Sequence, residues 1–218
     1  MRHLWLHGFA SGPTSSKGRF VGERLRERGI ELVIPDLNEP AFFDLTVTRM
    51  LERVDALAGA DRVALFGSSL GGFTAATWAA RRPGRVEALV LLAPAFDLAP
   101  RWARRMGPAE VEKWLRSGRF AFDHYAYGRK EDLSSAFLAD AQDYESFPLP
   151  DCPALVIQGT RDDVVDPALA REFTRRMGGR ARLVELPEGH ELTADLPALW
   201  RQIDGFLQAT ERGRPRST

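Results

Sequence analysis

The sequence predicts an α/β fold: a doubly wound, mainly parallel sheet of about six strands, with a small helical cap. Short apolar runs alternate along the chain with segments of helical periodicity, which is typical of a parallel sheet covered by helices on both faces. The run Val86–Leu92 is apolar apart from Glu87, as expected of a strand buried on both faces. With 218 residues and 44% apolar content, the chain is long enough for one domain with a full core.

The first half of the chain supplies four of the expected strands and three helices. Strands are predicted at residues 2–6, 31–35, 63–66 and 86–92, and helices at 15–28, 47–58 and 70–81. Apolar residues between 47 and 58 recur at i, i+3, i+4 and i+7, so they lie on one face of a helix. Gly29 and the pair Pro83-Gly84 are suitable helix ends.

The second half contains two further strands, at residues 154–158 and 182–186, and helices at 167–177 and 196–207. Asp166 is a plausible N-cap because a proline follows it at the first helical position. Residues 95–150 interrupt this rhythm and are too long for a plain connection, so we expect an inserted cap of helices over the sheet edge. We therefore predict a single domain over residues 1–210 and a disordered tail over 211–218.

Composition narrows the class of protein. Acidic and basic residues number 30 each, which gives no reason to expect a nucleic-acid or membrane-surface partner. Cys152 is the sole cysteine and begins an apolar run, which indicates a buried structural thiol. No segment approaches the roughly 18 apolar residues of a membrane span, and no signal peptide is evident. We expect a cytoplasmic protein.

A Gly-x-Ser-x-Gly turn, Gly67-Ser68-Ser69-Leu70-Gly71, joins the apolar run that begins at Val63 to a helix of small residues. In this setting the central serine lies on a tight, strained corner that exposes its hydroxyl at the sheet edge. The flanking glycines are explained if a Cβ there would collide with the neighbouring strand and helix. Ser69 is therefore the candidate nucleophile.

A serine nucleophile needs a histidine base and a carboxylate that orients the base. Among the four histidines, His190 follows a predicted strand directly and so lies at the carboxyl edge of the sheet, where His3, His7 and His124 are placed less well. Three aspartates follow the strand at 154–158, of which Asp162 is our choice. Asp163 and Asp166 are the alternatives, although Asp163 is also explained as a solvated residue and Asp166 as a helix cap.

Acyl transfer also needs two N–H donors for the oxyanion. The backbone N–H of Leu70 directly follows the nucleophile, and the loop His7-Gly8-Phe9 follows the first strand. We expect the Phe9 N–H to be the second donor.

Together these motifs make the chain resemble the α/β-hydrolase superfamily, and within it the small bacterial serine esterases with a His-Gly-Phe-x-Ser-x-Pro oxyanion loop. The resemblance extends over nearly the whole chain and includes His7-Gly8-Phe9-Ala10-Ser11-Gly12-Pro13, Pro35-Asp36-Leu37, Gly67-Ser68-Ser69-Leu70-Gly71, Gly159-Thr160-Arg161-Asp162 and Gly189-His190. It implies that Ser69, Asp162 and His190 have the triad roles. It also implies that the superfamily's first two strands are missing here.

The predicted function is hydrolysis of carboxylic esters with short to medium apolar acyl groups through an acyl-enzyme, without metal or organic cofactor. Four apolar residues of the cap are candidates for the acyl site: Trp102, Met106, Trp114 and Phe120. Arg101, Arg104 and Arg105 either receive an anionic substrate such as an acyl-CoA or form a solvated helix face. A thioesterase is thus the enzymatic alternative, and a binding protein that kept the fold without catalysis is the alternative of a different class. The partner is a small-molecule ester, and the oligomeric state is open.

Overall fold

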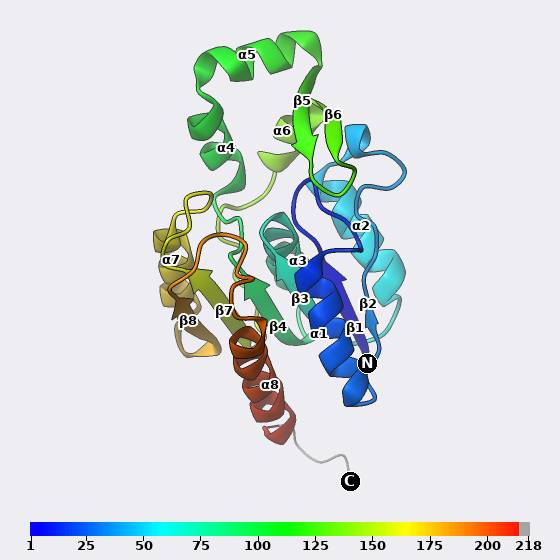
Figure 1. The fold of residues 1–218 in the computed structure, drawn as a ribbon, viewed down its shortest axis with the longest axis vertical. Coiled ribbons are helices and arrows are strands. Elements are labelled where there is room, and N and C mark those ends of the chain that lie inside the picture. Colours follow the sequence, from blue (N-terminus) through cyan, green and yellow to red (C-terminus); the bar gives the residue numbers. More distant parts are fainter. Residues whose placement is uncertain (214–218) are drawn as a thin grey trace.

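A six-stranded sheet forms the centre of the protein in the computed structural model, which describes residues 1–213 (Figure 1). Its strands have the order β2-β1-β3-β4-β7-β8, and each pair of neighbours is parallel. The bounds are β1 Arg2–Leu6, β2 Leu32–Val33, β3 Val63–Ser68, β4 Val86–Leu92, β7 Ala154–Gly159 and β8 Ala181–Leu186. The predicted fold class is confirmed, since each of these strands overlaps a predicted one.

Helices cover both faces of this sheet (Figure 1). One face carries α1 (Ser16–Glu27) and α8 (Leu196–Arg212), and the other carries α2 (Val47–Ala58), α3 (Leu70–Arg81) and α7 (Pro167–Met177). Successive side chains of β3 alternate between these two cores. Val63 and Leu65 pack on the side of α2 and α3, whereas Ala64 and Phe66 pack on the side of α1 and α8. The sheet is therefore buried on both faces, as its apolar strands predict.

The cap lies between β4 and β7 in sequence and beyond the carboxyl ends of the strands in space (Figure 1). It consists of α4 (Leu98–Met106), α5 (Pro108–Ser117), β5 (Arg119–His124), β6 (Arg129–Ser134) and α6 (Ala136–Ala141). The helices agree with the prediction, whereas the antiparallel hairpin β5–β6 was not predicted. Two 3₁₀ helices, η1 (Phe42–Asp44) and η2 (Gly178–Arg180), complete the described elements.

An aromatic cluster joins the cap to the body of the protein. Its seven members are Phe9, Phe42, Trp102, Trp114, Phe120, Phe122 and Phe137. Phe9 belongs to the loop after β1, and its ring centroid lies 4.9 Å from that of Trp102 and 5.2 Å from that of Phe122. The loop after the first strand is thus held directly against the cap.

Three further predictions concern single segments. Helix α8 ends at Arg212, so the predicted tail boundary at 211 was wrong, and residues 214–218 lie outside the described residues. Cys152 is buried, as predicted, and burial raises the pKa of its thiol to about 12. Among residues 1–213, no helix combines the length and the apolar character that crossing a bilayer requires.

Candidate active site

Ser69 occupies the corner between β3 and α3. Its backbone has φ 53° and ψ −117°, a conformation that non-glycine residues rarely adopt. Three backbone hydrogen bonds hold it there: its N–H donates to Leu92 O at 2.9 Å, and its carbonyl accepts from Phe73 N and Ala95 N, each at 3.0 Å. The surrounding strand and helix thus impose the strained corner that the Gly-x-Ser-x-Gly pattern predicts.

The two glycines of this pattern leave no room for a side chain. A Cβ on Gly67 would lie 2.3 Å from the carbonyl oxygen of Gly71, and a Cβ on Gly71 would lie 2.1 Å from the carbonyl oxygen of Leu6. These distances are far inside van der Waals contact. The close approach of β1, β3 and α3 at the elbow therefore requires glycine at both positions.

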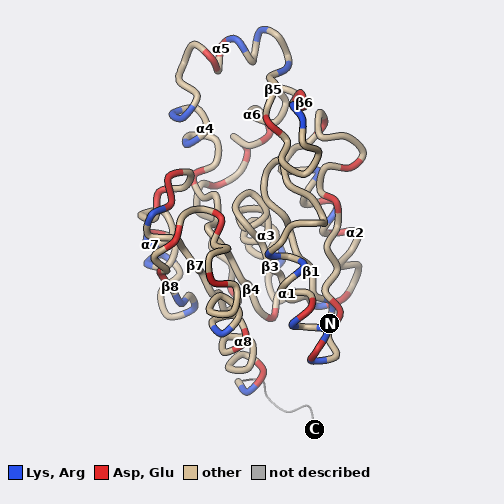
Figure 2. Tube along the Cα trace, in the orientation of Figure 1, with Lys and Arg blue, Asp and Glu red and all other residues tan. Residues whose placement is uncertain are grey.

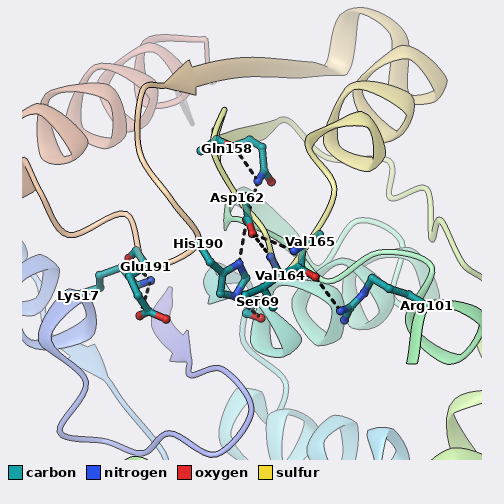
Figure 3. Close-up of polar contacts among 10 residues, drawn as sticks. Lys17, Ser69, Arg101, Gln158, Asp162, Val164, Val165, His190 and Glu191 are labelled. Carbon is teal, nitrogen blue, oxygen red and sulfur yellow. Dashed lines mark hydrogen bonds and ion pairs between the residues drawn. The ribbon is translucent and has the colours of Figure 1, made fainter. Parts of the chain in front are cut away.

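Ser69, His190 and Asp162 form one hydrogen-bonded chain (Figure 3). His190 Nε2 lies 3.0 Å from Ser69 Oγ, and His190 Nδ1 lies 2.8 Å from Asp162 Oδ2. A neutral imidazole that donates from Nδ1 to the carboxylate presents an unprotonated Nε2 to the serine hydroxyl. The structure thus brings together the three side chains that the sequence selected from the ends of β3, β7 and β8.

Asp162 is buried and its carboxylate is fully engaged. Besides His190, the side-chain amide of Gln158 donates to Oδ2 at 2.8 Å, and the N–H groups of Val164 and Val165 donate to Oδ1 at 2.9 and 2.8 Å. Burial acts to raise the pKa of Asp162, but the hydrogen bonds from His190, Val165 and Val164, together with the charge interaction with His190, outweigh it, so this pKa lies below its ordinary value. The carboxylate therefore stays ionised at neutral pH.

The two alternative aspartates have other places in the structure. Asp163 is exposed to solvent. Asp166 accepts a hydrogen bond from Ala168 N at 2.8 Å and is the N-cap of α7, as its sequence context predicts.

Of the four histidines, all within the described residues, only His190 is hydrogen-bonded to Ser69. His7 is buried and connects two loops: Leu37 N donates to its Nε2 at 2.9 Å, and its Nδ1 lies 2.9 Å from Gly8 O. His7 Nε2 also lies 3.5 Å from Asp36 Oδ1, and the proximity of the His7 ring lowers the pKa of that carboxyl. His3 lies in β1, and His124 is buried in the cap, where its ring stacks on Tyr127 at 3.7 Å. Of these three, His7 supports the loop that carries Phe9, because its ring is hydrogen-bonded to the backbone at Gly8 and Leu37.

This loop lies against the nucleophile. An ideal Cβ built on Gly8 would lie 3.4 Å from both Ser69 Cβ and Ser68 O, which puts Phe9 one residue from that contact. Leu70 is the first residue of α3, where the backbone N–H has no carbonyl partner within the helix. Both predicted oxyanion donors therefore belong to segments that meet at Ser69.

Lys17 is a buried residue near this site that the sequence analysis did not select. It lies in the first turn of α1, and its ammonium donates to the carbonyl of Glu191, the residue after His190 (Figure 3). Burial lowers the pKa of Lys17, although Glu191, Asp162 and Glu188 act in the opposite direction. The only available signal was composition, because Lys17 is one of three lysines among 30 basic residues.

Lys17→Met is expected to lower the free energy of unfolding by about 1–3 kcal/mol, because it leaves the Glu191 carbonyl without its donor. Urea unfolding measures this change. Lys113→Met is the matched control, since that side chain is 66% exposed on α5 and its loss should change stability by less than about 0.5 kcal/mol. Equal effects of the two substitutions would contradict the structural role of Lys17.

The same variant should alter the pH dependence of stability. The pKa of Lys17 in the folded protein lies below its ordinary value of 10.5. At a pH between the folded-state pKa and 10.5, the unfolded chain therefore binds more protons than the folded protein. The contribution of Lys17 therefore makes the wild-type protein more stable as the pH rises through this window, and Lys17→Met should lack that rise.

The four cap residues proposed for the acyl site differ in their surroundings. Trp114 is fully buried, and its indole N–H donates to Leu133 O at 3.0 Å, so it belongs to the core of the cap. Because Trp114 is fully buried, the structure gives no support to the prediction that this side chain contacts substrate. Trp102, Met106 and Phe120 are partly exposed. Trp102 is the member of this set that contacts Phe9 directly.

The chain has the α/β-hydrolase fold, as comparison with solved structures shows. Alpha/beta hydrolase domain-containing protein 10 from mouse is similar with a TM-score of 0.78 and 20% identity, over 95% of this chain and 89% of that one. The monoacylglycerol lipase of Paleococcus ferrophilus has a TM-score of 0.77 and 18% identity, over 95% and 94% of the two chains. Est1E from Butyrivibrio proteoclasticus has a TM-score of 0.72 and 20% identity, over 96% and 88%.

Residues 2–207 match one family model, and the chain belongs to that family, the uncharacterised protein family UPF0227. A search of curated proteins finds no significant match.

Proposed function

We propose that the protein is a serine hydrolase that cleaves carboxylic esters through an acyl-enzyme intermediate. The observation that carries this proposal is the hydrogen-bonded chain from Asp162 through His190 to Ser69, with the serine on a strained elbow. A buried carboxylate with this geometry holds the imidazole in the tautomer that can accept a proton from the hydroxyl. The similar structures described as an alpha/beta hydrolase domain-containing protein and a monoacylglycerol lipase agree with this chemistry.

In the proposed reaction, Ser69 Oγ attacks the ester carbonyl carbon while His190 Nε2 accepts the hydroxyl proton. The N–H groups of Phe9 and Leu70 donate hydrogen bonds to the oxyanion that develops on the carbonyl oxygen. The imidazolium then protonates the departing alcohol, and Ser69 is left acylated. A water molecule, deprotonated by His190, attacks the acyl carbon, and the acid is released as Ser69 recovers its proton. This sequence of steps needs no cofactor.

The apolar side chains of the cap favour a substrate with an apolar acyl group. Trp102 of the cap packs edge-on against Phe9, with an interplanar angle of 84°. An aromatic side chain of the cap therefore lies directly beside the proposed oxyanion loop. Met106 and Phe120 are the other partly exposed apolar residues in this set. We propose esters of short to medium acyl chains, and a cytoplasmic location remains our prediction.

A fluorophosphonate probe tests the proposal, because such probes modify serine hydroxyls that an adjacent base activates. We expect labelling of Ser69, identified by peptide mapping, together with turnover of p-nitrophenyl esters. Comparison of these esters with acyl thioesters of the same acyl group separates an esterase from a thioesterase. An inert Ser69 and no turnover would instead indicate a binding protein with a hydrolase fold.

A further inference from the structure

Arg101 extends from α4 of the cap toward the loop that carries Asp162 (Figure 3). Its Nη1 donates to the carbonyl of Val164 at 3.3 Å, two residues from Asp162. Its Nε is buried and has no hydrogen-bond partner among residues 1–213. The guanidinium therefore lies between the cap and the triad with part of its hydrogen-bonding capacity unused.

No carboxylate of the described residues forms an ion pair with Arg101. The two nearby acidic residues are engaged elsewhere: Asp97 accepts from Arg104 and from Ser146 Oγ, and Asp162 accepts from its four donors. Charged groups removed from water are normally paired, because desolvation without a counter-charge is costly. Arg101 thus departs from the usual pattern.

The charges around Arg101 also favour an added anion. Burial, together with the like charges of Arg105 and Arg104, lowers the pKa of Arg101 to about 10, against the opposing effect of Asp162 and Asp97. The group is still cationic at neutral pH. Helix α4 also carries Arg104 and Arg105 in its last turn, and both are exposed; Figure 2 shows basic residues on this helix. This end of the cap therefore has an excess of positive charge.

We propose that Arg101 forms an anion subsite beside the triad, which binds a negatively charged oxygen group of the substrate, such as a carboxylate. The inference rests on the proposed hydrolase function and narrows its substrate to esters with an acidic group. A guanidinium with free N–H donors suits this task because it binds carboxylate oxygens through fixed, planar donors. The anion can belong to the acyl part or to the alcohol part of the ester, and the two arms of the experiment distinguish these cases.

The experiment measures kcat/KM for two matched pairs of esters. For an anion on the acyl part, 4-nitrophenyl hydrogen adipate is compared with methyl 4-nitrophenyl adipate. For an anion on the alcohol part, 4-acetoxybenzoate is compared with its methyl ester. We expect the wild-type protein to prefer the anionic member of one pair. Arg101→Gln should reduce this preference, measured as the ratio of kcat/KM for the anionic ester to that for the neutral ester, by about tenfold or more.

Two further variants serve as controls. Arg105→Gln removes the same charge from an exposed position of α4 and should leave the preference within about threefold of wild type. Arg101→Lys keeps the charge without the planar donors and should retain part of the preference. Thermal unfolding of each variant shows whether it is folded.

Each contrary outcome has a distinct meaning. No preference in the wild type for either anionic ester would overturn the subsite and leave the proposed hydrolase function intact. An equal loss on neutral and anionic esters in Arg101→Gln would show that Arg101 only positions the Asp162 loop through Val164. Absence of turnover of all four esters, with Ser69 unlabelled, would overturn the subsite and the hydrolase function together.

Discussion

Ser69→Ala is expected to lower kcat for p-nitrophenyl esters by at least about 10³-fold and to abolish fluorophosphonate labelling. The substitution removes the hydroxyl to which His190 Nε2 is hydrogen-bonded, so no acyl-enzyme can form. The residual rate should be that of a site which still binds ester and still presents its N–H donors. Steady-state kinetics on purified protein, with KM measured separately, gives both quantities.

Ser68→Ala is the matched control because it removes a hydroxyl from the preceding residue, at the end of β3. Its labelling and turnover should remain close to those of the wild type. Both variants should unfold at nearly the wild-type temperature, since neither adds an atom to the elbow. Turnover by Ser69→Ala near the wild-type rate would refute the assignment of the nucleophile.

Gly71→Ala is expected to destabilise the fold by more than about 4 kcal/mol or to prevent folding. The new Cβ would lie 2.1 Å from Leu6 O and 2.5 Å from His7 O, and both of these atoms belong to backbone that cannot rotate away. The first strand and the start of α3 would have to separate. Circular dichroism and urea unfolding report this loss directly.

The same chemical change at another glycine, Gly205→Ala, is expected to have the opposite effect on stability. Gly205 lies inside α8, and a Cβ built there meets no atom within 4 Å. Alanine in a helix interior is favoured over glycine by about 0.5–1 kcal/mol, so this variant should be slightly more stable than the wild type. Similar stabilities of the two alanine variants would show that the elbow tolerates a side chain.

The sequence predicted the sheet and the triad positions because both depend on local patterns and one topological rule. Apolar runs identified the strands, and the carboxyl ends of parallel strands meet at one edge. Ser69 directly follows β3, and Asp162 and His190 lie in the loops that follow β7 and β8. Their convergence therefore needed no knowledge of side-chain contacts.

The cap was harder to predict because its hairpin is amphipathic over only a short length. In β5, Phe120, Phe122 and His124 alternate with exposed residues, which is the period of a strand. The partner strand β6 begins with Arg129-Lys130-Glu131-Asp132, whose charges hide the alternation. The aromatic content was interpreted as helical cap, and the pairing that stabilises β5 lies outside any local window.

For Lys17 and Arg101 the difficulty was different: Lys17 was not selected from the sequence, and Arg101 was not distinguished there from Arg104 and Arg105. Both are basic residues on amphipathic helices, where a solvated side chain is the usual outcome. Their burial depends on where the His190 loop and the Asp162 loop pass, which is a property of the assembled fold. Their hydrogen-bond acceptors are backbone carbonyls, which every residue has, so these partners cannot be recognised in the sequence.

Phe9 contributes its backbone to the loop beside Ser69 and its ring to the aromatic contacts with Trp102 and Phe122. A displacement of α4 or β5 would therefore move the amide proposed to receive the developing negative charge. We therefore expect the position of the cap and the geometry of the proposed oxyanion loop to depend on one another through the contacts of the Phe9 ring.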